Sequence, residues 1–211
     1  MAAADKKSDR RVVRSKEALR ASLLELMTEQ DFGSISITEI VERANYNRGT
    51  FYSHYDSKKA LLDDIISELI EDMLRSYRAP YENVEIFHID ELGANSILIF
   101  EHFYQHAAVY QILFKSDVLP NVRERMLVAL KQIAMEDLEY TNSEIDQELM
   151  AVYTIHALLG LVFHWIESGF KVPPSYMQDQ LIKLIHYRPR TAVTINRNAA
   201  PSPKGKNGTP K

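Results

Sequence analysis

Cysteine is absent from this chain of 211 residues. Its absence removes disulfides, thiolate zinc sites and cysteine nucleophiles from consideration, and is compatible with a reducing compartment. Long apolar runs are also missing, since stretches such as residues 158–163 end well short of the roughly 18–20 residues that a membrane span requires. The opening MAAADKKSDRR has no apolar core of the kind found in signal peptides. We therefore expect a soluble, cytoplasmic protein without a membrane partner.

Sequence motifs of common enzymes are absent as well. There is no G-x-S-x-G, phosphate-binding P-loop, dinucleotide-binding glycine fingerprint or H-E-x-x-H motif. His102 and His106 have the i, i+4 spacing of a metal-binding pair, but no third ligand lies nearby in the sequence. Protonation of this pair is an alternative use of the same spacing. We expect no catalytic residue, no metal and no cofactor.

Charge is distributed unevenly along the chain, although the net charge is only −4. Residues 1–60 hold 11 Lys and Arg against 9 Asp and Glu, whereas residues 61–187 hold 8 against 20. Residues 188–211 hold 6 basic residues and no acid. A basic N-terminal part beside an acidic body suggests that an anionic partner meets the N-terminal part.

Helical spacing of apolar residues dominates the chain, so the sequence predicts an all-α fold of about nine helices. A first helix is expected over about 15–30. Ser36 and Glu39 form the S-x-x-E capping box of a second, short helix, Asn47 caps a third, and Ser57 caps a long fourth helix that ends near Pro80. Further helices are expected at about 91–106, 107–115, 119–140, 143–168 and 174–187.

This pattern divides the chain into four parts. Residues 1–14 are expected to form a basic N-terminal arm, and residues 15–60 a domain of three helices. Residues 61–187 are expected to form a second, larger helical domain. The tail, residues 188–211, has four prolines, two glycines and no acid, and its composition predicts a disordered basic segment.

The second and third expected helices are short and follow each other closely. Two short helices joined by a tight turn and packed on a longer helix make a helix-turn-helix. Such a turn needs a residue that tolerates left-handed backbone angles, as Asn45 does. The third helix then presents Arg48, Gly49, Thr50 and Tyr52 near its N-terminus, where base edges are read in this geometry.

The run SITEIVERANYNRGTFYSHYDSKKALL, residues 36–62, closely resembles the signature of the TetR family. The resemblance covers about residues 15–62 and implies a nine-helix homodimer with a variable, ligand-binding C-terminal domain. It implies a base-facing set of Thr38, Arg48, Gly49 and Thr50, and a phosphate-contacting set of Ser36, Tyr52, His54 and Lys58. The sequence departs from the commonest pattern at Asn45, Tyr46 and Asn47, which replace a glycine, a small aliphatic residue and a serine.

The body offers two sets of candidates. Aromatic, methionine and histidine side chains that could line a ligand pocket, or equally a core, are Phe100, Phe103, Tyr104, Tyr110, Phe114, Met135, Tyr153, His156 and Phe163. Because residues 143–168 are apolar nearly all round, that helix must be covered on two sides. The resemblance places a dimer interface on the last two helices, with candidates Leu158, Gly160, Val162, Trp165, Leu181 and Leu184.

The fragments FYQHAAVYQILF and HWIESGF also resemble, more loosely, a subgroup of regulators similar to a dihydroxyacetone-kinase operon activator. They identify no ligand. The sequence thus predicts a transcriptional regulator that binds a palindromic operator in double-stranded DNA as a dimer, acting as a repressor that an unidentified small-molecule effector releases. An activator or coactivator of the same fold that works through a protein partner is the alternative.

Overall fold

The structure is a computed structural model that describes residues 2–139 and 144–187, with side chains described from Arg10 onward. These residues form nine α-helices and three short 3₁₀ helices, with no strand among them. The all-α prediction is confirmed. The predicted disordered tail, 188–211, lies outside the described residues.

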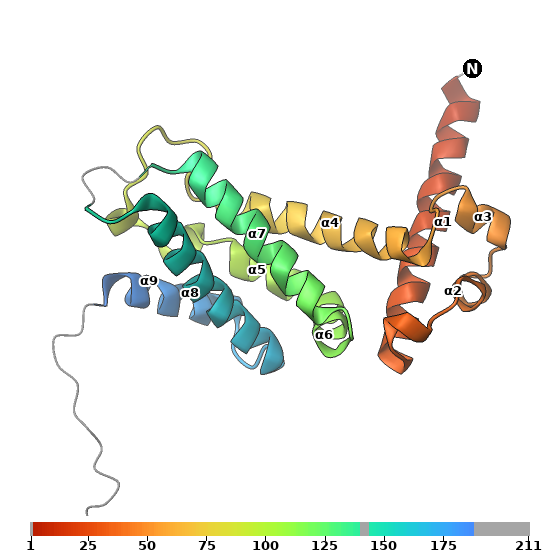
Figure 1. Ribbon diagram of the computed structural model, residues 1–211. Coiled ribbons are helices and arrows are strands. Elements are labelled where there is room, and N and C mark those ends of the chain that lie inside the picture. Colours follow the sequence, from red (N-terminus) through yellow and green to blue (C-terminus); the bar gives the residue numbers. More distant parts are fainter. Residues whose placement is uncertain (1, 140–143, 188–211) are drawn as a thin grey trace, which may run out of the picture.

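The N-terminal head consists of three helices and the start of a fourth (Figure 1). Its elements are α1 (Ala2–Glu29), η1 (Phe32–Ser34), α2 (Ile37–Arg43) and α3 (Arg48–Tyr52). The helix α1 begins 13 residues earlier than the predicted start at Ser15, because residues 2–14 contain no proline or glycine to stop it. The arm predicted for residues 1–14 is therefore helical from Ala2, and its role is left as a prediction.

Side-chain caps fix where the head helices begin. The Ser36 hydroxyl accepts the Glu39 amide N–H at 3.2 Å, and the Glu39 carboxylate accepts the Ser36 amide N–H at 2.7 Å, which is the predicted capping box. Asn47 caps α3 through the Thr50 amide N–H at 2.8 Å. Ser57 caps α4 in the same way. Each cap supplies an acceptor to an amide that has no partner within the helix.

The turn between α2 and α3 closes on Asn45, whose φ is 55°. The Tyr46 amide N–H reaches the Val41 carbonyl at 2.9 Å, and the Asn45 amide N–H reaches the Glu42 carbonyl at 3.1 Å. This pairing is a Schellman motif, which needs a left-handed residue at this point. Asparagine meets that need with less strain than other side chains, so the predicted role of Asn45 is confirmed.

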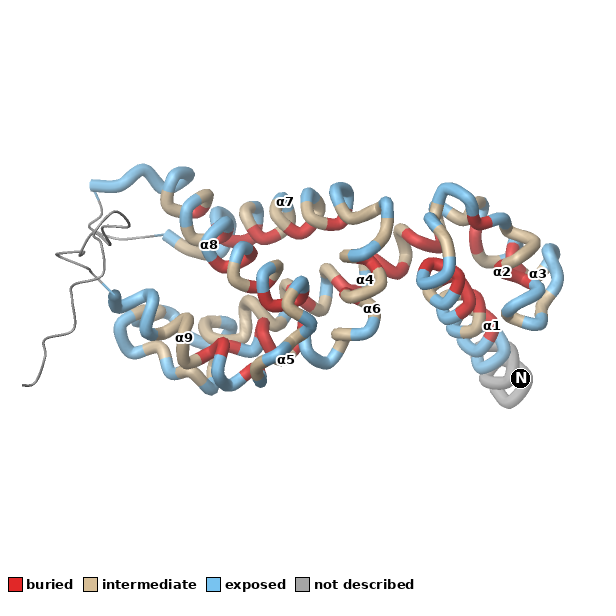
Figure 2. Tube along the Cα trace, turned by 90° about the horizontal axis from the view of Figure 1, so that it is seen from below, coloured by how far each residue is buried: buried red, intermediate tan, exposed pale blue. Residues whose placement is uncertain are grey.

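The long helix α4 (Lys58–Arg78) leaves the head and becomes part of the body. The body also contains η2 (Ile89–Glu91), η3 (Ala94–Ser96), α5 (Ile99–Gln105), α6 (Ala107–Lys115), α7 (Leu119–Asp137), α8 (Gln147–Glu167) and α9 (Pro174–His186). Figure 2 shows α7 and α8 on one side of the body and α5 and α9 on the other, with buried positions between them. The predicted helix over 91–106 is wrong in its first half, which holds the end of η2 and the 3₁₀ turn η3 before α5 begins.

The helix α8 has two different apolar faces. Ala151, Ile155, Leu158, Val162 and Trp165 recur at three- and four-residue intervals and are buried in the body. The opposite face is exposed. The helix α8 is long and apolar enough to cross a membrane, with a mean hydropathy of 1.7 over 18 of its residues, and it is the one such helix among residues 2–139 and 144–187. Counting short apolar runs missed this property, which follows from a buried face and an exposed face that are both apolar.

The turn η1 is held by one side chain from another helix. The Lys58 ammonium donates to the carbonyls of Phe32 at 2.8 Å, Gly33 at 2.8 Å and Ile35 at 2.5 Å. It also lies 4.9 Å from the centre of the Phe32 ring. Because a lysine ammonium has three protons, this arrangement uses all of them. Lys58 thus ties the α1–α2 turn to the first turn of α4.

Replacing Lys58 with methionine keeps the aliphatic stem and removes the three charge-assisted hydrogen bonds. We expect the free energy of unfolding to fall by about 2 kcal/mol, the scale of hydrogen bonds to a charged group, as measured by urea denaturation. Lys59→Met, which changes the exposed neighbouring lysine, serves as the control. Equal stability of the two variants would contradict the role given to Lys58.

Candidate nucleic-acid interface

The helix α3 has one buried aromatic side chain and an exposed outer face. Phe51 is fully buried under the helix, and its ring packs edge-on to Tyr52 and against Tyr55. Arg48, Gly49 and Tyr52 are exposed on the outer side, Tyr52 by 54%. One buried aromatic residue therefore holds α3 in place while its outer face stays open to a partner.

Arg48 and Thr38 are brought together from two helices. The Arg48 guanidinium donates a hydrogen bond to the Thr38 hydroxyl across the turn between α2 and α3. Both residues belong to the predicted base-facing set, and the contact places them on one continuous surface. A guanidinium at this position has further N–H groups that can reach the O6 and N7 atoms of a guanine.

Gly49 and Thr50, the other members of that set, differ in how accessible they are to a partner. A Cβ built on Gly49 would meet only the Asn47 amide oxygen, at 3.2 Å, so the absence of a side chain leaves room above the helix. The Thr50 hydroxyl is half-buried and lies 3.3 Å from the same Asn47 oxygen. Gly49 therefore lets a partner come close to the backbone of α3, whereas the Thr50 hydroxyl is partly used by the Asn47 cap.

Ser36 and Tyr52, two of the predicted phosphate contacts, are accessible. The Ser36 hydroxyl is exposed and donates to the Glu39 carboxylate at 2.6 Å. These bonds, with one from Gln30, lower the pKa of Glu39 to about 2. No hydrogen bond of the Tyr52 hydroxyl is seen. Tyr52 is free to reach an anion, whereas Ser36 is first of all a helix cap.

His54, another predicted phosphate contact, has a hydrogen-bond partner within the head. Its Nε2 lies 2.7 Å from the Ser15 hydroxyl on α1, and the ring is half-buried. Burial, reinforced by the charge of Lys16, lowers the pKa of His54. The ring is therefore neutral near pH 7 and joins α1 to the α3–α4 turn. Ser15 could not be identified as its partner from local patterns, because the two residues are 39 positions apart.

Lys58, the last of the predicted phosphate contacts, is also engaged within the head. All three of its ammonium protons point at the carbonyls of the η1 turn, so none is left for a phosphate oxygen. The first turn of α4 still exposes Lys59. Position in the sequence identified the helix terminus correctly but not the direction of the side chain.

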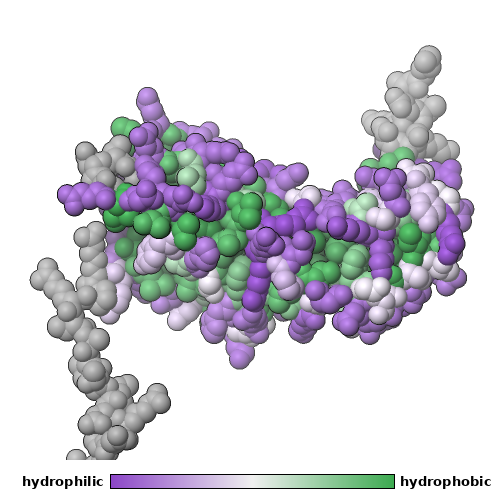
Figure 3. Space-filling view, in the orientation of Figure 1, coloured by the Kyte–Doolittle hydropathy of each residue, from purple (hydrophilic) through white to green (hydrophobic). Residues whose placement is uncertain are grey.

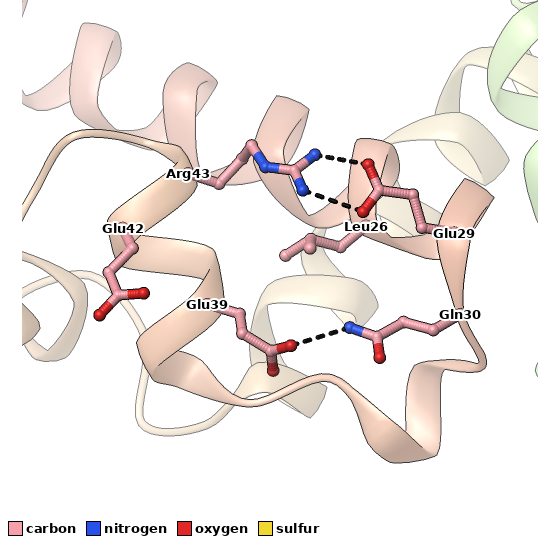
Figure 4. Close-up of a pocket in the computed structure, with 6 residues that line it drawn as sticks. All are labelled: Leu26, Glu29, Gln30, Glu39, Glu42 and Arg43. Carbon is pink, nitrogen blue, oxygen red and sulfur yellow. Dashed lines mark hydrogen bonds and ion pairs between the residues drawn. The ribbon is translucent and has the colours of Figure 1, made fainter.

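A hollow of about 450 Å³ lies between the end of α1 and α2 (Figure 4). Glu29 pairs with Arg43 through two hydrogen bonds of 2.8 and 2.9 Å, and Gln30 donates to Glu39 at 3.0 Å. Glu42 adds another carboxylate to the lining. Three carboxylates against one paired guanidinium make this hollow unsuited to a phosphate.

The predicted pocket residues do not gather around one cavity. Phe100, Phe103 and Tyr110 are buried in the core, and Phe114 and Phe163 flank the Arg123 guanidinium, 5.3 and 4.9 Å from it. The remaining four are exposed: Tyr104, Met135, Tyr153 and His156. These side chains fill the core or cover the surface.

A larger hollow of about 730 Å³ does exist in the body, at the far end of α4. The ion pair between Arg78 and Asp137 lies in its lining, with Nε and Oδ2 2.6 Å apart. Tyr81, Ile86 and Phe87 supply its aromatic and apolar part. None of the nine predicted pocket residues lines it.

The two histidines with metal-like spacing form a polar contact within the core. His102 Nε2 lies 2.8 Å from the Tyr110 hydroxyl, and burial lowers the pKa of His102 to about 4, with a further contribution from His106. His106 Nε2 lies 3.8 Å from the Asp72 carboxylate on α4. Among residues 2–139 and 144–187, no group of three or more histidine and acidic residues could hold a metal ion.

The candidates for a dimer interface separate into two groups. Leu158, Val162 and Trp165 are buried in their own subunit, which corrects their assignment to an interface, and Leu181 is half-buried against the same core. Gly160 and Leu184 are exposed, and a Cβ on Gly160 would meet nothing within 4 Å. The exposed face of α8 is therefore not the face that carries Leu158, Val162 and Trp165.

Comparison with known proteins agrees with this geometry. The family model described as bacterial regulatory proteins, tetR family, matches residues 19–65. A second model of the same family, TetR_C_8, described as transcriptional regulator C-terminal region, matches residues 90–187. The two matches cover the helix-turn-helix and most of the body.

Individual relatives show the same family. YxbF, an uncharacterized HTH-type transcriptional regulator of Bacillus subtilis (strain 168), is 27% identical over 196 residues, which are 90% of this chain and 50% of YxbF. The chain thus spans half the length of that relative. A TetR transcriptional regulator from Streptococcus agalactiae 2603V shares the fold with a TM-score of 0.58 and 20% identity, over 86% of this chain and 98% of the other.

The looser resemblance of the C-terminal part also has a structural counterpart. The dihydroxyacetone kinase operon activator DhaS superposes with a TM-score of 0.53 and 17% identity, over 81% of this chain and 93% of that one. A likeness at this identity concerns the fold alone. With two models of one family matched in order along the chain, and its exposed α3 in the place that the helix-turn-helix requires, this protein belongs to the TetR family of transcriptional regulators, which bind DNA and are not enzymes.

Proposed function

We propose that the protein is a cytoplasmic repressor that binds a palindromic operator as a homodimer and is released by a small effector. The observation that carries this proposal is the open N-terminal end of α3, where Arg48 and Thr38 share one surface and Gly49 leaves it uncovered. In a helix-turn-helix dimer the two recognition helices enter successive major grooves about 34 Å apart. A dimer bound to a promoter in this way blocks the promoter sterically, so we expect it to repress transcription.

The effector belongs to the body in this proposal. Its best-placed site is the hollow of about 730 Å³ beside Arg78, since ligand pockets commonly have about 300–1,000 Å³. Arg78 is the last residue of α4, the helix that starts in the head. An effector bound there would act on the C-terminal end of α4, whose N-terminal end follows α3 in the head.

The direct test is a gel shift with the DNA that flanks the protein's own gene, repeated with candidate metabolites. Binding to a flanking fragment supports the proposal, and release by a metabolite identifies the effector. Failure to bind any flanking fragment unless a second protein is present would favour the activator or coactivator alternative.

Arg48→Ala should weaken binding to the operator by about 1–3 kcal/mol, the cost of losing one bidentate contact to a guanine. Binding to random DNA should be nearly unchanged, because a base contact contributes little there. Fluorescence anisotropy with both DNAs measures this difference. Arg43→Ala, whose guanidinium pairs with Glu29, is the matched control, and an equal loss on both DNAs would assign Arg48 to the phosphate backbone instead.

The first turns of α1 extend past α3 in Figure 1. Arg10, Arg11 and Arg14 are exposed there. Arg11 lies one helical turn before Ser15, on the face that contacts the α3–α4 turn. We infer that this basic end of α1 follows the phosphate backbone beside the groove that α3 enters.

Changing Arg10, Arg11 and Arg14 together to glutamine should reduce the dependence of log K on log salt by about one unit for each arginine that meets a phosphate. Sequence preference should persist. A control with Lys115, Lys171 and Lys183 changed to glutamine removes the same charge from exposed positions of the body. An unchanged slope in the arginine variant would exclude the N-terminal turns from the interface.

The homodimer is supported by the exposed face of α8. This face carries Leu149, exposed by 65%, Tyr153, exposed by 73%, and Gly160, above which space is open. Exposed apolar residues continue on α9 with Tyr176, Leu184 and Ile185. Hydrophobic surface gathers on this part of the body in Figure 3, broken by hydrophilic side chains. An apolar surface of this kind is typical of a protein–protein interface.

Combining Tyr153→Asp with Gly160→Arg should convert the dimer into a monomer at micromolar concentration, because it places two charges in an apolar contact. Sedimentation velocity detects the change, and operator affinity should fall in parallel. Val128→Asp adds a charge at an apolar position of α7 that is exposed by 57% and should leave the dimer intact. A wild-type protein that sediments as a monomer would contradict the proposed interface.

A further inference from the structure

Within the part of the chain that the structure describes, one hydrogen-bonded contact joins the head to the body directly, apart from α4. Asp117 lies in the turn between α6 and α7, and its carboxylate accepts the amide N–H of Phe32 at 2.9 Å and of Gly33 at 3.2 Å. These amides begin the η1 turn of the head, 84 and 85 residues away in the sequence. Each carboxylate oxygen takes one amide, so the contact fixes orientation as well as distance.

The same turn is held from its other side by Lys58. The ammonium binds carbonyls of η1 while the Asp117 carboxylate binds its amides. Lys58 belongs to α4 and therefore fixes the turn within the head. Asp117 belongs to the body and fixes the turn relative to it, so its carboxylate adds to α4 and to the packing of α1 against α6 in defining the angle between head and body.

Rotation of the head about α4 would break the Asp117 contact. The helix α4 alone is a single rod, which leaves twisting and bending free at its emergence from the head. The carboxylate lies off this rod, beside the packing of α1 against α6, and opposes both movements. Because the contact is exposed, its amides can exchange the carboxylate for water when the α6–α7 turn moves.

We propose that Asp117 is a positioning residue that sets the angle of each head on its body, and thereby the spacing of half-sites that the dimer accepts. This inference rests on the proposed function, since a spacing exists only for a dimer on two half-sites. Each base pair added between half-sites rotates one of them by roughly 34°. A head that has the Asp117 contact tolerates less of this rotation than a head that lacks it.

The angle itself can be measured without DNA. The chain contains no cysteine, so Glu42→Cys on α2 and Val128→Cys on α7 provide two unique positions for spin labels, one on the head and one on the body. Labelled protein diluted with unlabelled protein should give one narrow distance distribution. We expect Asp117→Ala to broaden it. Glu124→Ala, which removes an exposed carboxylate from α7, should not.

Operator binding supplies the second measurement. A series with zero, one or two base pairs inserted between half-sites gives a ratio of dissociation constants for altered and native spacing. We expect Asp117→Ala to lower this ratio several-fold, and Asp117→Asn, which keeps one acceptor oxygen, to lower it less. Affinity for an isolated half-site should stay within about twofold of wild type, because α3 itself is unchanged.

The outcomes separate this inference from the function on which it rests. An unchanged distance distribution and spacing ratio in Asp117→Ala would overturn the role of Asp117 and leave the dimeric regulator standing. Loss of half-site affinity equal to the loss on the full operator would show local damage to the head and also overturn it. Wild-type protein without any spacing preference would contradict the dimeric proposal itself.

Discussion

The side chains of Lys58 and Asp117, which carry opposite charges, hold the backbone of the η1 turn. The arrangement of the head depends on this turn. The Lys58 ammonium donates hydrogen bonds to the carbonyls of the η1 turn, and the Asp117 carboxylate accepts hydrogen bonds from its amides. A turn of this kind has few internal hydrogen bonds, so side chains must satisfy the rest of its polar groups. With η1 fixed, Ser36 can begin α2 at a defined place on α1, and α3 follows through the Asn45 turn. The position of the DNA-reading surface is thus set by residues that do not read DNA.

Sequence reasoning succeeded where the determinants are local. The capping box of Ser36 and Glu39, the Asn47 cap and the left-handed Asn45 all depend on partners within five residues, and such patterns are visible in a single sequence. The starts of α2, α3 and α4 followed from them. The segment 91–98 lies within a predicted helix but has no side-chain cap, and it holds only the end of η2 and the 3₁₀ turn η3.

The errors at the candidate sites have a common physical cause, which is that spacing gives a helix its period but not its rotation about the axis. Leu158, Val162 and Trp165 face their own core, while Tyr153 on the same helix faces outward. Lys58 and His54 lie at the expected helix ends, yet their side chains turn to η1 and to Ser15. Partners that are 23 to 85 residues distant, Asp117 among them, leave no trace in the local pattern.

The hydrogen bond between Arg48 and Thr38 has a consequence for discrimination between DNA sequences. In the free protein one N–H of the guanidinium already donates to Thr38, and its other N–H groups stay available for a guanine in the proposed operator complex. At a wrong base the arginine keeps the threonine as an acceptor, so its charge is not left without a partner. This retained hydrogen bond limits the penalty for a mismatch, which favours a regulator that tolerates variation among its operators.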